Sequence, residues 1–157
     1  MSKKTGALRI ISPDGIFYEG RMLGVILPSL DGQLEFLPCH EEMITVIITG
    51  ELKYQTEDEK WHVAAVGGGV AETANNRCDI YVDFAERPED IDKNRARAAL
   101  ERATEQMRQK KSIEEYKISQ AALARALTRL RVADRDPFRE SRHAAGGSQI
   151  RGYKWTG

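Results

Sequence analysis

Four arginines in the C-terminal half of the chain have the residue type and spacing needed to hold an anion. Arg95 and Arg102 are seven residues apart, and Arg125 and Arg129 are four residues apart. If the segment is helical, each pair shares one face of its helix. A guanidinium group donates hydrogen bonds in a planar fork that matches carboxylates and phosphates. These residues therefore predict an anion site, and a triphosphate is the external ligand that fits it.

The same arginines have two other interpretations, and the residues alone leave all three open. Arginines on charged helices are commonly solvated or form weak surface ion pairs. Glu86 and Asp92 are the internal carboxylates that can neutralise them. The chain has no Walker-type glycine-rich loop, so catalysis of phosphoryl transfer is not expected. Cys39 and His40 are adjacent, and neighbours on an extended chain point in opposite directions, so they do not form a nucleophile–base pair.

The elements that must position these arginines form a helical hairpin over residues 88–134. Pro88 and Asp90 mark its start. The sequence Ser112-Ile113-Glu114-Glu115 is a capping box that begins a second helix. Because little chain separates the two helices, they are expected to be antiparallel neighbours. Their predicted apolar stripes are Ala96, Ala99, Leu100, Ala103 and Met107 in the first helix, and Tyr116, Leu123, Ala126, Leu127 and Leu130 in the second.

Residues 7–87 predict an antiparallel β-sandwich of about ten strands, because short β-branched segments alternate with turns every 8 to 12 residues. Turn signals stand at Pro13-Asp14-Gly15, Asp31-Gly32 and Asn75-Asn76. The apolar run from Met22 to Leu27 predicts one strand buried on both sides. Residues 1–6 are an N-terminal extension. Residues 135–157 form a tail without periodicity, predicted to be disordered or partly a remnant of cloning.

Composition narrows the class of protein further. The 157 residues carry 24 basic and 24 acidic side chains, so overall charge gives no reason to expect a nucleic-acid partner. No run approaches the roughly 20 apolar residues of a membrane span, and the first residues do not read as a signal peptide, so no direct membrane insertion is expected. Cys39 and Cys78 have no metal-type spacing and are expected to be free thiols in a reducing cytosol. No catalytic residue or metal site is predicted.

Several segments, taken in order, resemble the ε subunit of the F-type rotary ATP synthase of bacteria. The resemblance covers residues 7–134, and no single short motif carries it. The matching segments are Ser12-Pro13-Asp14-Gly15, Leu37-Pro38 with His40, Gly68-Gly69, Ala85-Glu86-Arg87, Ile91-Asp92-Lys93-Asn94-Arg95-Ala96 and residues 124–133.

The resemblance implies a ten-stranded sandwich with a two-helix hairpin, and a non-catalytic place in the central stalk. The sandwich would bind the γ subunit and sit on the ring of c subunits, coupling the two in a proton- or ion-translocating enzyme. The candidate interface residues are Asp31, Gly32, Gln33 and His40. The helices would inhibit ATP hydrolysis when they extend into the catalytic α/β hexamer. The implied location is peripheral, at the cytoplasmic face of the bacterial inner membrane.

The resemblance also implies that ATP is a possible regulatory ligand, with no cofactor required. In ATP-binding members the nucleotide stabilises the folded-down hairpin. Carried over by position, the candidate ATP-binding residues are Glu86, Ile91, Asp92, Arg95, Ala96, Arg102, Arg125 and Arg129. Ile118 stands where some ATP-binding members have an arginine, which predicts a weaker site. Two alternatives remain: a rotor subunit without a usable nucleotide site, and a free-standing β-sandwich module that binds sugar or peptide.

Overall fold

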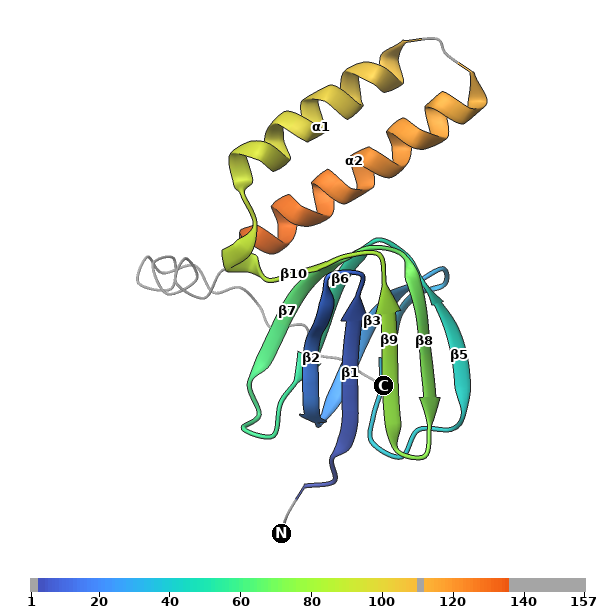
Figure 1. Cartoon of the computed structure of the whole chain (residues 1–157), viewed down its shortest axis with the longest axis vertical. Coiled ribbons are helices and arrows are strands. Elements are labelled where there is room, and N and C mark those ends of the chain that lie inside the picture. The colour runs from blue at the N-terminus through green and yellow to red at the C-terminus, as the bar shows by residue number, and fades with distance from the viewer. Residues whose placement is uncertain (1–2, 110–111, 136–157) are drawn as a thin grey trace.

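The computed structural model describes residues 3–109 and 112–135. Ten strands are followed by a short 3-10 helix and two α-helices (Figure 1). The elements are β1 Gly6–Ser12, β2 Gly15–Met22, β3 Gly24–Ser29, β4 Gly32–Phe36, β5 Met43–Ile47, β6 Gly50–Gln55, β7 Trp61–Val66, β8 Gly69–Ala74, β9 Arg77–Val82, β10 Ala85–Glu86, η1 Pro88–Asp90, α1 Lys93–Arg108 and α2 Ile113–Ala133. The predicted sandwich followed by a helical hairpin is therefore confirmed.

The strands form one continuous sheet that curves around its own core. Its order is β10-β7-β6-β3-β5-β8-β9-β1-β2, with β4 paired to β3. All of its pairings are antiparallel except that between β1 and β9. The ring centres of Tyr18 on β2 and Tyr54 on β6 lie 4.6 Å apart, which brings the β2 edge of the sheet back toward its opposite end. The buried core includes Leu8, Ile10, Val25, Leu27, Phe36, Leu52 and Ile80.

The predicted turns are present, but one predicted strand is divided in two. Gly15 and Gly32 have φ values of 128° and 110°, which explains glycine at these turns. Asn75 and Asn76, also at positive φ, form the β8–β9 turn. The run from Met22 to Leu27 spans two strands, since Met22 ends β2 and β3 begins at Gly24. The expectation of a single strand was wrong because Leu23 joins the buried last residue of β2 to β3, which is largely buried.

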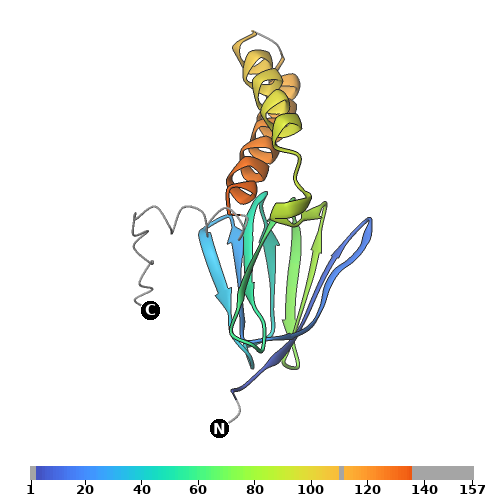
Figure 2. The same ribbon diagram turned by 90° about the vertical axis from the view of Figure 1, so that its left-hand side faces the viewer.

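The hairpin stands on one end of the sandwich and contacts it mainly through the last turns of α2 (Figures 1 and 2). The first helix begins later than expected, because Ile91 is extended and separates η1 from α1. Asp92 caps α1 by accepting a hydrogen bond from the backbone N–H of Arg95. Ser112 caps α2 in the same way through Glu115.

Most of the predicted helical stripes are correct. Ala96, Ala103 and Ala126 are buried where the helices meet. Tyr116 is 47% exposed, so its assignment to the buried stripe was wrong. Ser119 takes that place, because its small hydroxyl can bond the carbonyl of Glu115 inside the contact. Residues 136–157, most of the predicted tail, lie outside the described residues.

Candidate functional site

A cavity of about 440 Å³ lies between the two helices and the segment that joins them to the sandwich. This volume is within the range of small-molecule sites, roughly 300–1,000 Å³. Side chains from β10, η1, α1 and α2 and from the two residues before α1 converge on it. The lining residues are Glu86, Asp90, Ile91, Asp92, Arg95, Ala96, Ala99, Arg102, Ala126 and Arg129.

The local sequence explains why the cavity is open and polar. Arg95, Ala99 and Arg102 follow one another at intervals of four and three residues, so they lie on one face of α1. The facing position on α2 is Ala126, which is 1% exposed. Alanine lets the helix backbones approach closely but fills little space beyond its β-carbon. The longer arginine side chains therefore border a space that no apolar side chain occupies.

The charges of the cavity are only partly neutralised. Arg129 donates from Nε and Nη2 to the two carboxylate oxygens of Glu86, at 2.9 and 3.0 Å. Its guanidinium also lies 4.4 Å from the ring centre of Phe84, a favourable cation–π position. Among the described residues, neither Arg95 nor Arg102 has an ion-pair partner. The α1 side of the cavity therefore carries two guanidinium groups able to receive an anion.

The structure brings together most of the residues expected to bind ATP. Glu86, Ile91, Asp92, Arg95, Ala96, Arg102 and Arg129 all line the cavity, whereas Arg125 does not. Sequence reasoning missed Asp90, Ala99 and Ala126 as lining residues. The two alanines could have been found, since both belong to the predicted apolar stripes. Asp90 was taken only as a helix-start signal, because the extended residue after it was not foreseen.

The candidate interface residues fall into two separate places. Asp31, Gly32 and Gln33 are exposed at the β3–β4 turn, beside Leu30, which is 74% exposed. His40 lies beyond the other end of β4, in a loop tied to the β8–β9 turn by a 2.8 Å hydrogen bond from Cys39 N to Asn76 Oδ1. The His40 ring packs edge-on against Phe36 at 4.7 Å. The length of β4 therefore separates His40 from the turn.

An exposed apolar row crosses the outer face of the sheet. Strand register aligns Val46, Val70, Tyr81, Ile11 and Ile16 across β5, β8, β9, β1 and β2. Val46 is 53% exposed and Ile16 is 58% exposed. A contiguous apolar row on the surface is typical of a protein–protein contact. We refer to these five residues as the apolar row.

The described residues contain no group of three or more His, Cys, Asp or Glu side chains placed to hold a metal ion. Both cysteines are free thiols; Cys39 is exposed and Cys78 is buried. Burial is the main cause that raises the pKa of the Cys78 thiol to about 12. No helix in the described part of the chain is long and apolar enough to cross a membrane.

The fold and the cavity define a β-sandwich protein with a docked, arginine-bearing helical hairpin, and comparisons identify its family. Residues 5–88 match the β-sandwich domain of the ATP synthase delta/epsilon chain. Residues 89–134 match the long α-helix domain of that chain. The ATP synthase epsilon chains of Caldicellulosiruptor bescii and Caldicellulosiruptor saccharolyticus are each 36% identical over 127 residues, covering 81% of this chain and 92% of the relative.

Solved structures share the fold. A chain of the Euglena gracilis mitochondrial ATP synthase assembly of OSCP, F1 and c-ring superposes with a TM-score of 0.72 at 21% identity, over 82% of this chain and 81% of that one. A chain of the Tetrahymena thermophila mitochondrial ATP synthase central stalk and c-ring gives a TM-score of 0.57 at 13% identity, over 85% and 99%. The present chain belongs to the ATP synthase delta/epsilon family, which confirms its resemblance to the ε subunit.

Proposed function

We propose that the chain is a non-catalytic central-stalk subunit that couples γ to the c-ring of a bacterial F-type ATP synthase and regulates ATP hydrolysis through its hairpin. In this proposal it is peripheral, at the cytoplasmic face of the inner membrane. Family membership supports the place in the enzyme. The site supports the regulatory part, because it is formed by the hairpin rather than by the sandwich alone.

The observation that carries the regulatory part is a pair of arginines, Arg95 and Arg102, inside a cavity of about 440 Å³. Neither has an ion-pair partner in the part of the chain that the structure describes. Two guanidinium groups on one helix face suit the phosphates of ATP. The alanines beside them offer an apolar surface for the base. Because α1 and α2 both line the cavity, a ligand bound there would contact the helices only in their paired arrangement.

Regulation then follows from binding linkage. A ligand that binds one position of the hairpin shifts the balance between positions only by its differential affinity. ATP bound in the cavity would favour the docked hairpin, and loss of ATP would release it toward the catalytic α/β hexamer. Inhibition of hydrolysis would therefore deepen as ATP falls.

The sandwich offers separate surfaces for the other two proposed partners. The apolar row is the surface that suits γ, since burying it would remove exposed aliphatic and aromatic side chains from water. The β3–β4 turn at Asp31, Gly32 and Gln33 is the proposed contact with the c-ring. Its neighbour Leu30, 74% exposed, supplies an apolar tip for that contact.

Isothermal titration of the purified full chain with ATP tests the ligand. The wild-type protein should release or absorb heat with a saturable profile at millimolar ATP or below. Arg102→Gln should weaken binding by about tenfold or more, because a hydrogen bond to a charged group contributes roughly 1.5–3 kcal/mol. Arg97→Gln is the matched control, since Arg97 is exposed on the same helix and outside the cavity lining.

No heat at millimolar ATP, from protein that circular dichroism shows to be folded, would refute the ligand. The chain would then be a structural rotor subunit without a usable nucleotide site. A separate pull-down with purified γ distinguishes either subunit from a free-standing binding module, which would show no affinity for γ.

A further inference from the structure

Two carboxylates on the sandwich lie in one row beneath the end of the hairpin. In the strand register, Glu51 on β6 and Glu86 on β10 both pair with Ala65 on β7. Side chains at directly paired positions point to the same face of a sheet, so the two glutamates flank Ala65 on one face. Two strand spacings separate them, about 10 Å. We refer to Glu51, Ala65 and Glu86 as the acidic seat.

The end of α2 and the turn that follows it carry a matching pair of cations, Arg129 and Arg135. Arg129 binds Glu86, and Nη1 of Arg135 lies 2.9 Å from Oε1 of Glu51. The two arginines are six residues apart, which corresponds to about 9 Å along a helix axis. This rise is close to the spacing of the two glutamates. Between the arginines, Val132 and Ala133 are 0% and 2% exposed, and Ala65 of the seat is 0% exposed.

Of the two carboxylates in the acidic seat, Glu51 depends more strongly on its partner. Its side chain is 17% exposed, against 31% for that of Glu86. Its Oε1 atom is buried and has no hydrogen-bond donor among the described residues, because Arg135 approaches without hydrogen-bond alignment. Arg135 is also the only charge partner of Glu51 in the described part of the chain. A buried carboxylate that loses its partner is strongly unfavourable.

We propose that the acidic seat and the arginine pair form a two-point latch that sets the resting position of the hairpin without nucleotide. When α2 leaves the sandwich, Glu51 loses its counter-charge, and this loss favours return of the helix. Asp134 strengthens the base of the hairpin from the other side, because its carboxylate pairs with Lys93 at the start of α1. The latch rests on the proposed movement of the hairpin and adds a residue pair outside the nucleotide cavity.

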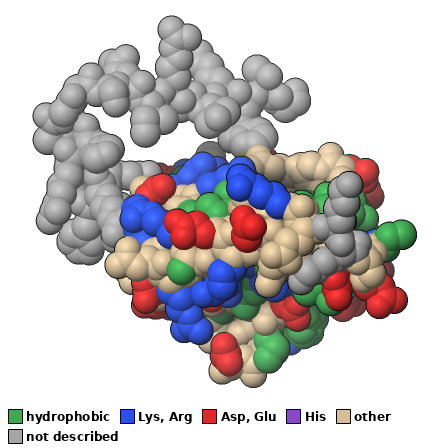
Figure 3. All heavy atoms as spheres, turned by 90° about the horizontal axis from the view of Figure 1, so that it is seen from above, with side chains coloured by type: hydrophobic (Ala, Val, Ile, Leu, Met, Phe, Trp, Pro, Cys, Tyr) green, Lys and Arg blue, Asp and Glu red, His purple; other side chains and the backbone are tan. Residues whose placement is uncertain are grey.

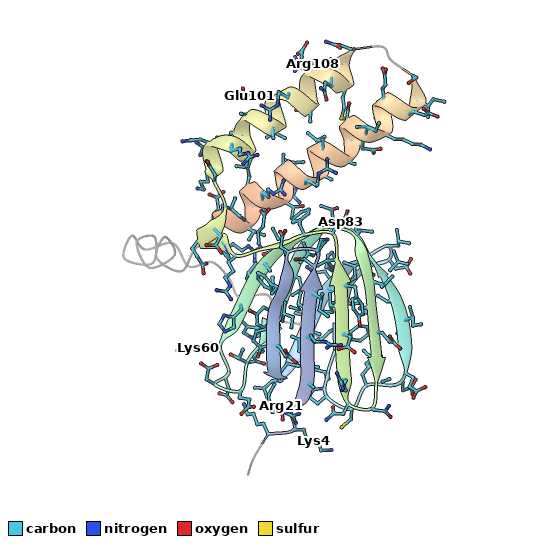
Figure 4. All side chains as sticks on the ribbon, in the orientation of Figure 1. Lys4, Arg21, Lys60, Asp83, Glu101 and Arg108 are labelled. Atoms are coloured by element: carbon cyan, nitrogen blue, oxygen red, sulfur yellow. The ribbon has the colours of Figure 1, made fainter. Side chains whose placement is uncertain are left out.

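The distance between two spin labels on the full chain, measured by double electron–electron resonance, tests the latch. One label is placed on the native Cys39, which is exposed, while the buried Cys78 stays unlabelled. The other is placed at Glu101→Cys on α1, a position that Figure 4 shows on the side of the hairpin away from the sandwich. The distance distribution then gives the docked and undocked populations without ATP and without any partner subunit.

Arg135→Gln should raise the ratio of undocked to docked chains by about tenfold, since it strands the Glu51 carboxylate only in the docked state. Glu51→Gln should also raise it, because the docked state then loses the attraction between Glu51 and Arg135. Arg131→Gln is the matched control: it removes one positive charge from the last turn of α2, and Arg131 is exposed without an ion-pair partner among the described residues. The control should keep the wild-type distances.

The latch is overturned if both variants keep the wild-type distance distribution, or if Arg131→Gln shifts it as much as they do. The reversed pair, Glu51→Lys with Arg135→Glu, should return the population toward docked and excludes a general loss of folding as the cause. Failure of the latch is distinguishable from failure of the proposed function. The distances are measured without ATP or γ, whereas the ATP titration and the γ pull-down use neither label.

Discussion

Replacement of Arg129 by glutamine should release the end of α2 from the sandwich while leaving the sandwich folded. The substitution removes both hydrogen bonds to Glu86, at 2.9 and 3.0 Å, and the position over the Phe84 ring at 4.4 Å. Both members of the ion pair are about 30% exposed, so water screens their attraction. The effect should be confined to the end of α2, because the contacts within the sandwich core do not involve Arg129.

The magnitude follows from these contacts. A bidentate, partly exposed ion pair contributes about 1–1.5 kcal/mol after screening. The cation–π contact adds about 0.5 kcal/mol. A total of about 1.5–2 kcal/mol corresponds to a change of roughly 10- to 30-fold in the docking equilibrium. Arg129→Lys should lose less, since it keeps the charge over Phe84 but not the planar fork.

Amide hydrogen exchange measures this opening directly. In Arg129→Gln, protection of Val132 and Ala133 should fall by up to about 30-fold, while protection of Ile80 in the sandwich core stays as in the wild type. Arg131→Gln serves again as the control with one positive charge fewer. The reasoning is refuted if Val132 and Ala133 keep their protection, or if Ile80 loses protection to the same degree, which would indicate global unfolding.

Three further predictions concern the sandwich. Val46→Glu should weaken binding to purified γ by at least tenfold, because it places a charge in the apolar row, whereas Trp61→Glu on β7 should not; equal effects of the two in surface plasmon resonance would exclude the row as the contact. In the folded chain at pH 8, a thiol reagent should modify Cys39 but reach Cys78 only after denaturation, and rapid reaction of both would contradict the buried site. The pKa of the Cys78 thiol is raised from 9.0 to about 12 in the folded chain, so this thiol ionises in the unfolded state first. Its ionisation should therefore lower the free energy of unfolding, measured by denaturant titration, as the pH rises above about 9.

Much of this fold could be predicted because its local signals agree with one another. Gly15, Gly32 and Asn76 lie where the backbone has positive φ, and the turns predicted at these residues separate the strands correctly. The alanine stripe of α1 and the cap at Ser112 gave the hairpin and its pairing. The failures arose where two elements meet at a single residue. Leu23 joins two strands inside one apolar run, and extended Ile91 separates two helical segments that have one continuous composition.

The cavity was partly predictable for a different reason. Spacing alone grouped Arg95 with Arg102 on one helix face, and the predicted antiparallel hairpin placed Arg129 on the neighbouring helix. It could not show that Glu86 would bind Arg129 and leave Arg95 and Arg102 without ion-pair partners among the described residues, because Glu86 and Arg129 are 43 residues apart. The salt bridge between Glu51 and Arg135 was missed for the same reason. Glu51 reads as an ordinary strand residue, and Arg135 appeared to begin the tail.

The central claim is that the hairpin regulates ATP hydrolysis while the sandwich holds the chain in the stalk. The most direct measurement is the rate of ATP hydrolysis by a reconstituted α/β hexamer with γ, comparing the full chain with a chain that ends after Arg87. At low ATP, the full chain should inhibit hydrolysis and the shortened chain should not, although both bind γ. Equal hydrolysis rates with the two chains, both shown to be bound, would contradict the account.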